Sequence, residues 1–234
     1  MSNIIYHNAD SLEVLKSIPD GSVDFILTDP PYEVDATSGG GYVNNKANTK
    51  PIAERIGHLS QGFDMDTYFQ EFERVLKKMN TAIFCSNKQV PKIMSWFMDR
   101  GYFTTLLVWH KYNAIPSVNN KYAPDLEFIV LARETGSPFN NIGVKEQSKL
   151  FRYPFPSGKD RIHPTEKPVN LLRRLLRIHT NEGNIVLDPF AGSMTTGIAC
   201  HKENRDAVLI EIDKDMFEKA KTRLEGIRSQ LAMF

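Results

Sequence analysis

The residues Asp29-Pro30-Pro31-Tyr32 place an acid, two prolines and an aromatic ring directly after a short apolar run. That run, residues 23–27, is rich in β-branched and aromatic side chains and predicts a buried strand. Two consecutive prolines can neither continue a strand ladder nor enter a helix, so the strand must end there. Asp29 and a proline carbonyl could then accept both N–H bonds of a planar amine, while Tyr32 stacks on its ring. The alternative is a strand followed by a simple proline turn.

A second candidate site follows another predicted strand near the C-terminus. The turn Asp188-Pro189-Phe190-Ala191-Gly192-Ser193 opens a helix, and Glu211 ends the next strand. This order is typical of nucleotide sites, where the acid accepts hydrogen bonds from a ribose diol and the glycine lets a ligand approach the backbone. Because GxGxxG and a P-loop lysine are both absent, a nucleoside without pyrophosphate fits better than a dinucleotide. GxSxG, the pattern around a serine nucleophile, is absent too. The alternative is a turn with a structural role only.

Alternating helices and strands must position these two motifs. Apolar periodicity predicts helices at residues 11–18, 66–79, 89–99, 194–202 and 217–231, and strands at 23–27, 81–85, 103–109, 127–132, 184–187 and 207–210. One more helix should start with Thr165 as its N-cap and Pro168 in its first turn. The alternation predicts an α/β fold with a mostly parallel sheet covered by helices on both faces. Both motifs should then meet at the carboxyl edge of the sheet, where strand order reverses.

Length and composition fit one ordinary α/β domain over residues 1–234. The chain is 41% hydrophobic and 24% charged, and its net charge of +1 neither favours nor excludes a nucleic-acid partner. No apolar run reaches transmembrane length and no signal pattern opens the chain, so we expect a cytoplasmic protein without a membrane partner. Cys85 and Cys200 lie in apolar segments and indicate buried thiols; we expect no disulfide and no metal site.

Two segments depart from this regular pattern. Residues 33–63 are rich in Gly, Asn and Ser and predict a mobile loop of the kind that forms a lid. Residues 133–179 hold ten lysines and arginines against four acids, with aromatic residues between them. Basic and aromatic residues together are typical of a nucleic-acid surface, although a solvated charged surface is the common alternative. Lys149, Arg152, Lys159 and Arg161 are our candidates for such nucleic-acid contacts.

Three motifs together resemble the amino-specific DNA methyltransferases. They are Asp29-Pro30-Pro31-Tyr32, residues 163–168 (His-Pro-Thr-Glu-Lys-Pro) and residues 186–193 (Val-Leu-Asp-Pro-Phe-Ala-Gly-Ser). The first motif precedes the other two, which is similar to the permuted beta group of that family. The resemblance covers nearly the whole chain and is weakest in residues 33–63 and 134–160. It implies a Rossmann-like methyltransferase fold, a short basic target-recognition insertion at 134–164 that contacts DNA, and a role in restriction-modification.

The resemblance also implies S-adenosylmethionine as cofactor and a flipped base in duplex DNA as substrate. The catalytic motif would consist of Asp29, Pro30, Pro31 and Tyr32: Asp29 and the Pro30 carbonyl would accept hydrogen bonds from the amine, and Tyr32 would stack on the extruded base. His163 could instead cap or pack before the following helix. A homodimer is an alternative to a monomer. The residues implied on the cofactor side are Asp10, Asp29, His163, Thr165, Lys167, Asp188, Phe190, Gly192, Ser193 and Glu211.

The substrate stays open among related chemistries. An acid at position 29 favours the N6 amine of adenine, whereas N4-cytosine enzymes more often carry serine there. A methyltransferase acting on RNA or on a protein amide would use the same acceptors. A nucleic-acid-binding module without activity is a further alternative. Its support is Met194, which stands where the family usually has glycine and could crowd the cofactor or the start of the helix.

Overall fold

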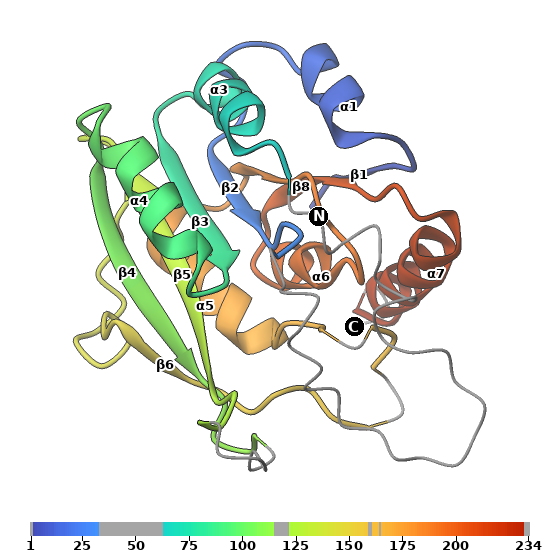
Figure 1. Cartoon of the computed structure of the whole chain (residues 1–234). Helices are drawn as coiled ribbons and strands as arrows, with labels where there is room; N and C mark the ends of the chain where they lie inside the picture. Colours follow the sequence, from blue (N-terminus) through green and yellow to red (C-terminus); the bar gives the residue numbers. More distant parts are fainter. Residues whose placement is uncertain (1, 33–62, 115–121, 159–160, 164, 232–234) are drawn as a thin grey trace.

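The computed structural model describes residues 2–32, 63–114, 122–158, 161–163 and 165–231 (Figure 1). The loop expected at residues 33–63 lies outside the described residues except for Phe63, and so does Lys159. In the described part of the chain, no helix is both long and apolar enough to cross a bilayer.

The described strands form one eight-stranded sheet in the order β1-β8-β7-β2-β3-β5-β4-β6. Neighbouring strands are parallel except where β5 pairs with β3 and with β4. The predicted α/β fold with a mostly parallel sheet is therefore confirmed. The strands are β1 (Ile4–His7), β2 (Phe25–Thr28), β3 (Asn80–Cys85), β4 (Phe103–His110), β5 (Leu126–Arg133), β6 (Leu150–Arg152), β7 (Ile185–Asp188) and β8 (Asp206–Ile210).

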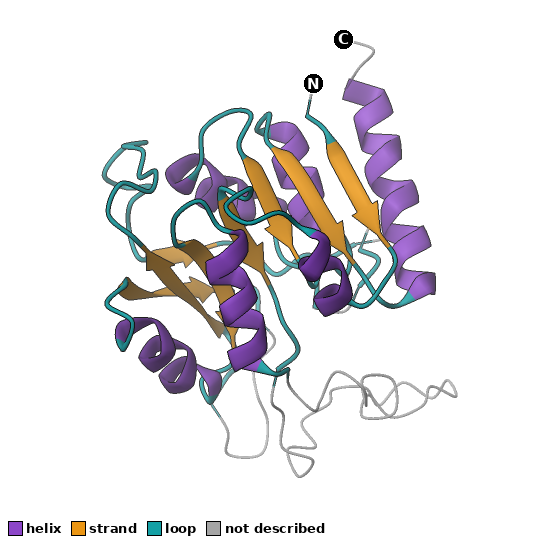
Figure 2. Cartoon of the chain, turned by 90° about the horizontal axis from the view of Figure 1, so that it is seen from above, coloured by secondary structure: helices purple, strands orange, loops and turns teal. Residues whose placement is uncertain are grey.

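Helices cover both faces of this sheet (Figures 1 and 2). The side chains of β2 alternate between the faces: Phe25 and Leu27 join one apolar core, and Ile26 joins the other. The first core is closed by α5 (Val169–His179), α6 (Thr195–Lys202) and α7 (Lys214–Leu231). The second is closed by α1 (Ser11–Ser17), α3 (Met65–Val75) and α4 (Gln89–Met98).

The strand order reverses between β7 and β2. Ile26 of β2 is in register with Leu187 of β7 on one side and with Thr81 of β3 on the other. The carboxyl ends of β2 and β7 therefore lie at the same edge of the sheet. This is the meeting point expected from the sequence, and it is where parallel α/β sheets bind ligands.

Several element boundaries differ from those expected. Thr165 is not a helix cap, because α5 begins at Val169 and Pro168 occupies the N-cap position with an extended ψ of 127°. The helix expected at 66–79 ends at Val75, since Leu76 is extended and forms a β-bridge with Val23. The strand β6 was not predicted at all in the basic segment, nor was β1 at the N-terminus. Both are short and depend on pairing with β4 and β8.

Candidate active site

Asp29 follows β2 directly and has one committed and one available oxygen. Its Oδ2 receives the Lys167 Nζ at 2.5 Å. Its Oδ1 is buried and has no hydrogen-bond partner among the described residues. A buried carboxylate oxygen without a donor is costly in a folded protein and marks a place where a ligand donor would be accepted.

Behind Asp29 lies a chain of charged groups that the sequence did not reveal. Lys167 Nζ contacts Glu127 Oε1 at 2.7 Å, and Tyr32 donates its hydroxyl proton to the same oxygen at 2.7 Å. Lys111 Nζ contacts the other oxygen, Glu127 Oε2, at 2.8 Å. Glu127 sits near the start of β5, opposite Trp109 of β4. Recognising the β4–β5 hairpin was the only signal that could have placed Glu127 beside Lys111.

The protonation states of this group follow from burial and charge. Burial raises the pKa of Asp29 more than the charge of Lys167 lowers it, although 27% of the side chain is still exposed. Burial also opposes ionisation of Glu127, but Lys167 and Lys111 overcome it and lower its pKa to about 2. Burial, then the Asp29 and Glu127 charges, raise the pKa of Tyr32. At neutral pH Glu127 is therefore an anion and Tyr32 a neutral donor.

A side chain from α4 holds the proline turn. Gln89 is 1% exposed and donates its amide Nε2 to the Pro31 carbonyl at 3.1 Å. The Gln89 Oε1 accepts from the backbone N–H and the hydroxyl of Ser86, each at 3.0 Å. Within the described residues the Pro30 carbonyl accepts no hydrogen bond. The turn is thus fixed at Pro31 and leaves the Pro30 oxygen available beside Asp29.

Asp188 at the end of β7 organises the second motif. Its carboxylate accepts from the hydroxyls of Thr28 at 2.8 Å and Thr196 at 2.6 Å, and from the Phe190 backbone N–H at 3.2 Å. The residue is 3% exposed, and burial raises the pKa of Asp188 to about 6. Its three donors all belong to the protein and come from β2, the turn and α6, so Asp188 shapes the turn.

Glu211 at the end of β8 is held in a way that suits a polyol ligand. Its Oε2 accepts from the Gly192 N–H at 2.8 Å and its Oε1 from the Asp213 N–H at 2.7 Å. Each oxygen keeps a further lone pair, and burial raises the pKa of Glu211. Gly192 has a φ of 47°, and a Cβ built there would meet nothing within 4 Å. The turn is therefore open on the side of the glycine, and its residues fit a ribose-bearing cofactor.

Met194 occupies the position after this turn without facing its open side. The residue adopts a left-handed conformation with a φ of 55° and is 0% exposed. Its side chain belongs to the apolar core beneath α5 and α6. The left-handed backbone explains why glycine suits this position, and it costs a methionine on the order of 1–2 kcal/mol. The side chain thus lies in the protein core.

Three other residues implied on the cofactor side have local partners. Asp10 caps α1, accepting from the N–H groups of Leu12 at 2.9 Å and Glu13 at 3.3 Å. His163 Nδ1 lies 2.9 Å from the hydroxyl of Thr165. Burial lowers the pKa of His163, and the Asp29 charge opposes this shift. His163 is not the cap of α5, because Pro168 holds the N-cap position of that helix.

Phe190 and Ser193 complete the turn of the second motif. The Phe190 ring packs on Tyr68 with a centroid separation of 4.9 Å and on Phe63 with one of 5.6 Å. The Ser193 hydroxyl lies 2.8 Å from that of Thr195. The turn consequently has an aromatic wall, formed by Phe190 with Tyr68 and Phe63, and a buried hydroxyl pair.

The basic segment divides into structural and exposed residues. Arg174 is 5% exposed, lies 3.9 Å over the Phe151 ring and donates to the carbonyls of Glu146 and Ser148. Arg173 and Arg177 both approach Glu203, at 2.7 and 3.9 Å. These three arginines therefore stabilise the fold around α5. Lys149, Arg152 and Arg161 are exposed and lie outside α5.

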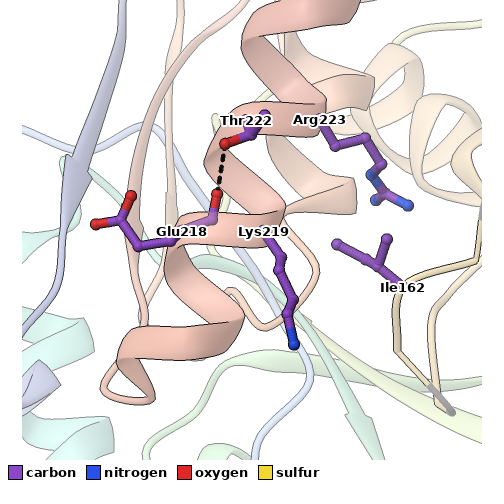
Figure 3. A pocket seen from close by; sticks show the side chains of 5 residues that line it. All are labelled: Ile162, Glu218, Lys219, Thr222 and Arg223. Carbon is purple, nitrogen blue, oxygen red and sulfur yellow. Dashed lines mark hydrogen bonds between the residues drawn. The ribbon is translucent and has the colours of Figure 1, made fainter.

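A hollow beside α7 lies outside the two motifs (Figure 3). It is lined by Ile162 and by Glu218, Lys219, Thr222 and Arg223 of α7. Arg223 also donates to both oxygens of Glu166, at 2.8 and 3.0 Å, and to the Ser193 carbonyl at 2.9 Å. This arginine links α7 to the residues 163–168 motif and to the turn of the second motif.

The fold and the paired motifs define the class of α/β methyltransferases. A family described as DNA methylase matches residues 23–222, and the chain belongs to that family. The type II methyltransferase M.HpaI of Haemophilus parainfluenzae is 28% identical over 240 residues, which cover 93% of this chain and 73% of that protein. M2.LlaDCHI of Lactococcus lactis subsp. cremoris is 26% identical over 247 residues, covering 95% and 89%.

Solved structures agree with this assignment. The M1.HpyAVI–SAM complex has a TM-score of 0.70 and 29% identity, covering 94% of this chain and 98% of that one. The cytosine-N4-specific PvuII DNA methyltransferase has a TM-score of 0.73 at 17% identity, covering 98% and 93%, which shows a shared fold. The chain is therefore a DNA methyltransferase of the group that modifies exocyclic amines.

Proposed function

We propose that this enzyme methylates the N6 amine of adenine in DNA, with the target base flipped out of the duplex. The observation that carries the proposal is the buried Asp29 Oδ1, which has no donor among the described residues. It lies at the edge of the sheet that also carries the Glu211 turn, so amine and cofactor would meet between β2 and β7. An acid at this position, rather than a serine, favours adenine.

Placed acceptors are the chemical contribution of the protein. The lone pair of an exocyclic amine is delocalised into the ring, which makes the nitrogen a poor nucleophile. Asp29 Oδ1 and the Pro30 carbonyl would accept its two N–H bonds and favour a pyramidal nitrogen with a free lone pair. Because burial raises the pKa of Asp29, its carboxylate is also a better base for the proton that the nitrogen loses.

The cofactor is S-adenosylmethionine, which supplies an electrophilic methyl group when bound. Glu211 would accept the ribose hydroxyls, and the open turn at Gly192 would admit the nucleoside to the backbone. The aromatic wall of Phe190 would flank the adenine ring of the cofactor, while Asp188 and Ser193 keep the turn in shape. We further propose that Asp10, His163 and Thr165 border this pocket.

DNA contacts are proposed for the exposed basic residues Lys149, Arg152 and Arg161, together with Lys159. Arg152 lies in β6, the strand at the edge of the sheet, and Lys149 lies next to it. Phosphate contacts by such residues fix the duplex without reading its sequence. We expect the enzyme to act in the cytoplasm, and sedimentation with and without DNA would distinguish a monomer from a homodimer.

The identity of the product tests the proposal directly. The purified enzyme would be incubated with S-adenosylmethionine and with duplex or single-stranded DNA, and the DNA digested to nucleosides for chromatography. N6-methyladenine is the expected product. Methyl on the N4 of cytosine would overturn the adenine assignment while retaining the family, and methyl on RNA or protein with none on DNA would overturn the substrate class.

A further inference from the structure

Glu127 lies at the centre of an alternating row of charges behind the amine-accepting motif. The row runs from Lys111 to Glu127, Lys167 and Asp29, with successive nitrogen–oxygen distances of 2.8, 2.7 and 2.5 Å. The side chains of Lys167 and Glu127 are 7% and 11% exposed, so water does not screen their contact strongly. Interactions in such a setting respond to the loss of a single charge.

We propose that Glu127 is a positioning residue for methyl transfer, holding the Tyr32 phenol and sharing Lys167 with Asp29. The inference rests on the proposed function, because Tyr32 and Asp29 are the groups expected to touch the flipped base. It also assigns Lys167 to the base side of the site, whereas the family resemblance implies a place on the cofactor side.

The first effect of Glu127 is on the ring of Tyr32. The phenol hydroxyl donates to Glu127 at 2.7 Å, and the Lys167 Nζ lies 5.5 Å from the ring centroid. A ring anchored at its hydroxyl cannot rotate freely about its side-chain bonds. Stacking on a base then costs less conformational entropy, because the ring is already ordered.

The second effect is on the charge available at Asp29. Lys167 contacts two carboxylates, Asp29 and Glu127, and the negative charge of Glu127 partly offsets the positive charge that Asp29 experiences. Asp29 therefore has a higher proton affinity than it would have in a pair with Lys167 alone. Without the Glu127 charge, Lys167 would interact with Asp29 alone and would stabilise its ionised carboxylate more strongly. The amine would then meet a weaker acceptor at Asp29 Oδ1.

The other titratable groups near Asp29 are common to every variant considered below. His163 lies before α5, and its neutral form is favoured by burial. Cys85 of β3 stays protonated because burial raises its pKa to about 12. Asp188 of β7 adds a carboxylate whose pKa burial raises to about 6. Differences between variants in pH dependence therefore report on the charges that are changed.

The test compares Glu127→Gln and Lys167→Met by the pH dependence of kcat/KM for methyl transfer into DNA. Glu127→Gln keeps the shape of the side chain and removes a negative charge. The acid limb, which is the fall of kcat/KM on the low-pH side of the profile, should therefore move to lower pH. Lys167→Met removes a positive charge, so the acid limb should move to higher pH. In Glu127→Gln, kcat should fall on the order of 10- to 100-fold, the scale of a small misplacement of reacting groups. Calorimetry should show unchanged S-adenosylmethionine binding in both variants.

Glu73→Gln is the matched control. Glu73 accepts from the Tyr102 hydroxyl at 2.8 Å and lies 3.7 Å from Arg100, so its chemistry is similar at a distant place on α3. The acid limb of the Glu73→Gln enzyme should coincide with that of the wild type. Tyr32→Phe should lower kcat, and adding it to Glu127→Gln should lower kcat by less than the product of the two separate effects.

Two results would overturn the inference. One is an acid limb in Glu127→Gln that coincides with the wild type, which decides the matter even if Lys167→Met does not fold. The other is weakened S-adenosylmethionine binding in Lys167→Met together with an acid limb at the wild-type pH. That result would mean that Lys167 binds the cofactor. The readout is total methyl in DNA and assumes no particular base. A wild-type enzyme that transfers no methyl to DNA would refute the proposed function instead.

Discussion

Thr28 and Asp188, 160 residues apart in the sequence, are joined by a hydrogen bond of 2.8 Å between the Thr28 hydroxyl and the Asp188 carboxylate. Thr28 immediately precedes Asp29, and Asp188 opens the turn that ends beside Gly192. The bond thus ties the strand that presents the amine acceptor to the strand that presents the cofactor turn. Both groups are almost fully buried, with exposures of 2% and 3%, so the tie is shielded from water.

Asp29 is predicted to carry the chemistry and not the cofactor affinity. Asp29→Ala removes one acceptor aimed at the amine, and methyl transfer should fall on the order of 10²-fold or more. Asp29→Asn retains one amide oxygen without the charge and should lie between wild type and alanine. Radiolabelled methyl transfer gives the rates and calorimetry gives S-adenosylmethionine affinity, which should be retained. Full activity in Asp29→Ala would refute the mechanism.

Glu211 is predicted to bind the cofactor ribose. Glu211→Ala removes a charged acceptor from a partly buried site and should weaken S-adenosylmethionine binding by roughly 1–3 kcal/mol. Calorimetry measures the affinity, and thermal unfolding reports any loosening of the turn at Gly192. Asp215→Ala, at an exposed acid in the first turn of α7, is the control and should leave the affinity unchanged. Equal affinity in both variants would mean that Glu211 supports the turn only.

Arg152 and Arg161 are predicted to bind DNA phosphates. Replacing both with alanine should weaken DNA binding and reduce its salt dependence by about one unit of slope for each phosphate that is no longer neutralised. Fluorescence anisotropy over a range of salt concentrations gives the slope. Lys202→Ala changes an exposed base at the C-terminal end of α6, away from the carboxyl edge of the sheet, and should leave the slope as it is. An unchanged slope in the double variant would remove these arginines from the DNA surface.

Met194→Gly is predicted to destabilise the protein although glycine is the better residue for its backbone. Relief of the left-handed conformation would stabilise by on the order of 1–2 kcal/mol. Removing a fully buried methionine side chain costs about 2–5 kcal/mol, so the packing effect is the larger of the two. Asn204 has a similar φ of 54° but is exposed, and Asn204→Gly should change the free energy of unfolding little. Urea denaturation compares them, and a more stable Met194→Gly would contradict this balance.

His179 is predicted to make the protein less stable in acid. The ring is 2% exposed and stacks on Phe25 at 5.6 Å, and burial, then the Arg133 charge, lower its pKa from 6.5 to about 3. Below about pH 6.5, His179 therefore binds a proton in the unfolded chain but stays neutral in the folded protein. Stability from this group is complete above that pH and is lost as the pH falls towards 3, by about 1.4 kcal/mol per unit.

His179→Phe should remove this acid sensitivity, because phenylalanine has no titrating group. The free energy of unfolding would be measured in urea at several pH values between about 4 and 7 for both proteins. The advantage of the wild type over the variant should shrink as the pH falls. Asp188 titrates in the same range with the opposite sign, but it is present in both proteins and cancels. Parallel pH profiles would contradict a buried, neutral His179.

Much of the site was determined by the sequence itself. Consecutive prolines end a strand wherever they occur, so Asp29 had to lie at the end of β2. The spacing from Gly192 to Glu211 likewise follows from one strand, one turn and one helix. These features depend on neighbours in the chain, and local sequence therefore predicted them.

Tertiary structure alone decided which side chains meet. Glu127 and Lys167 belong to distant segments: the placement of β5 between β3 and β4 brings Glu127 to this edge of the sheet, and the segment before α5 brings Lys167 between Glu127 and Asp29. Lys167 lies 138 residues from Asp29 and is held there by a contact of 2.5 Å. The partner of a charged side chain is set by strand order and by burial, which no local pattern encodes. For the same reason Arg174, one of many bases in its segment, became a buried support of the fold while Arg152 stayed on the surface.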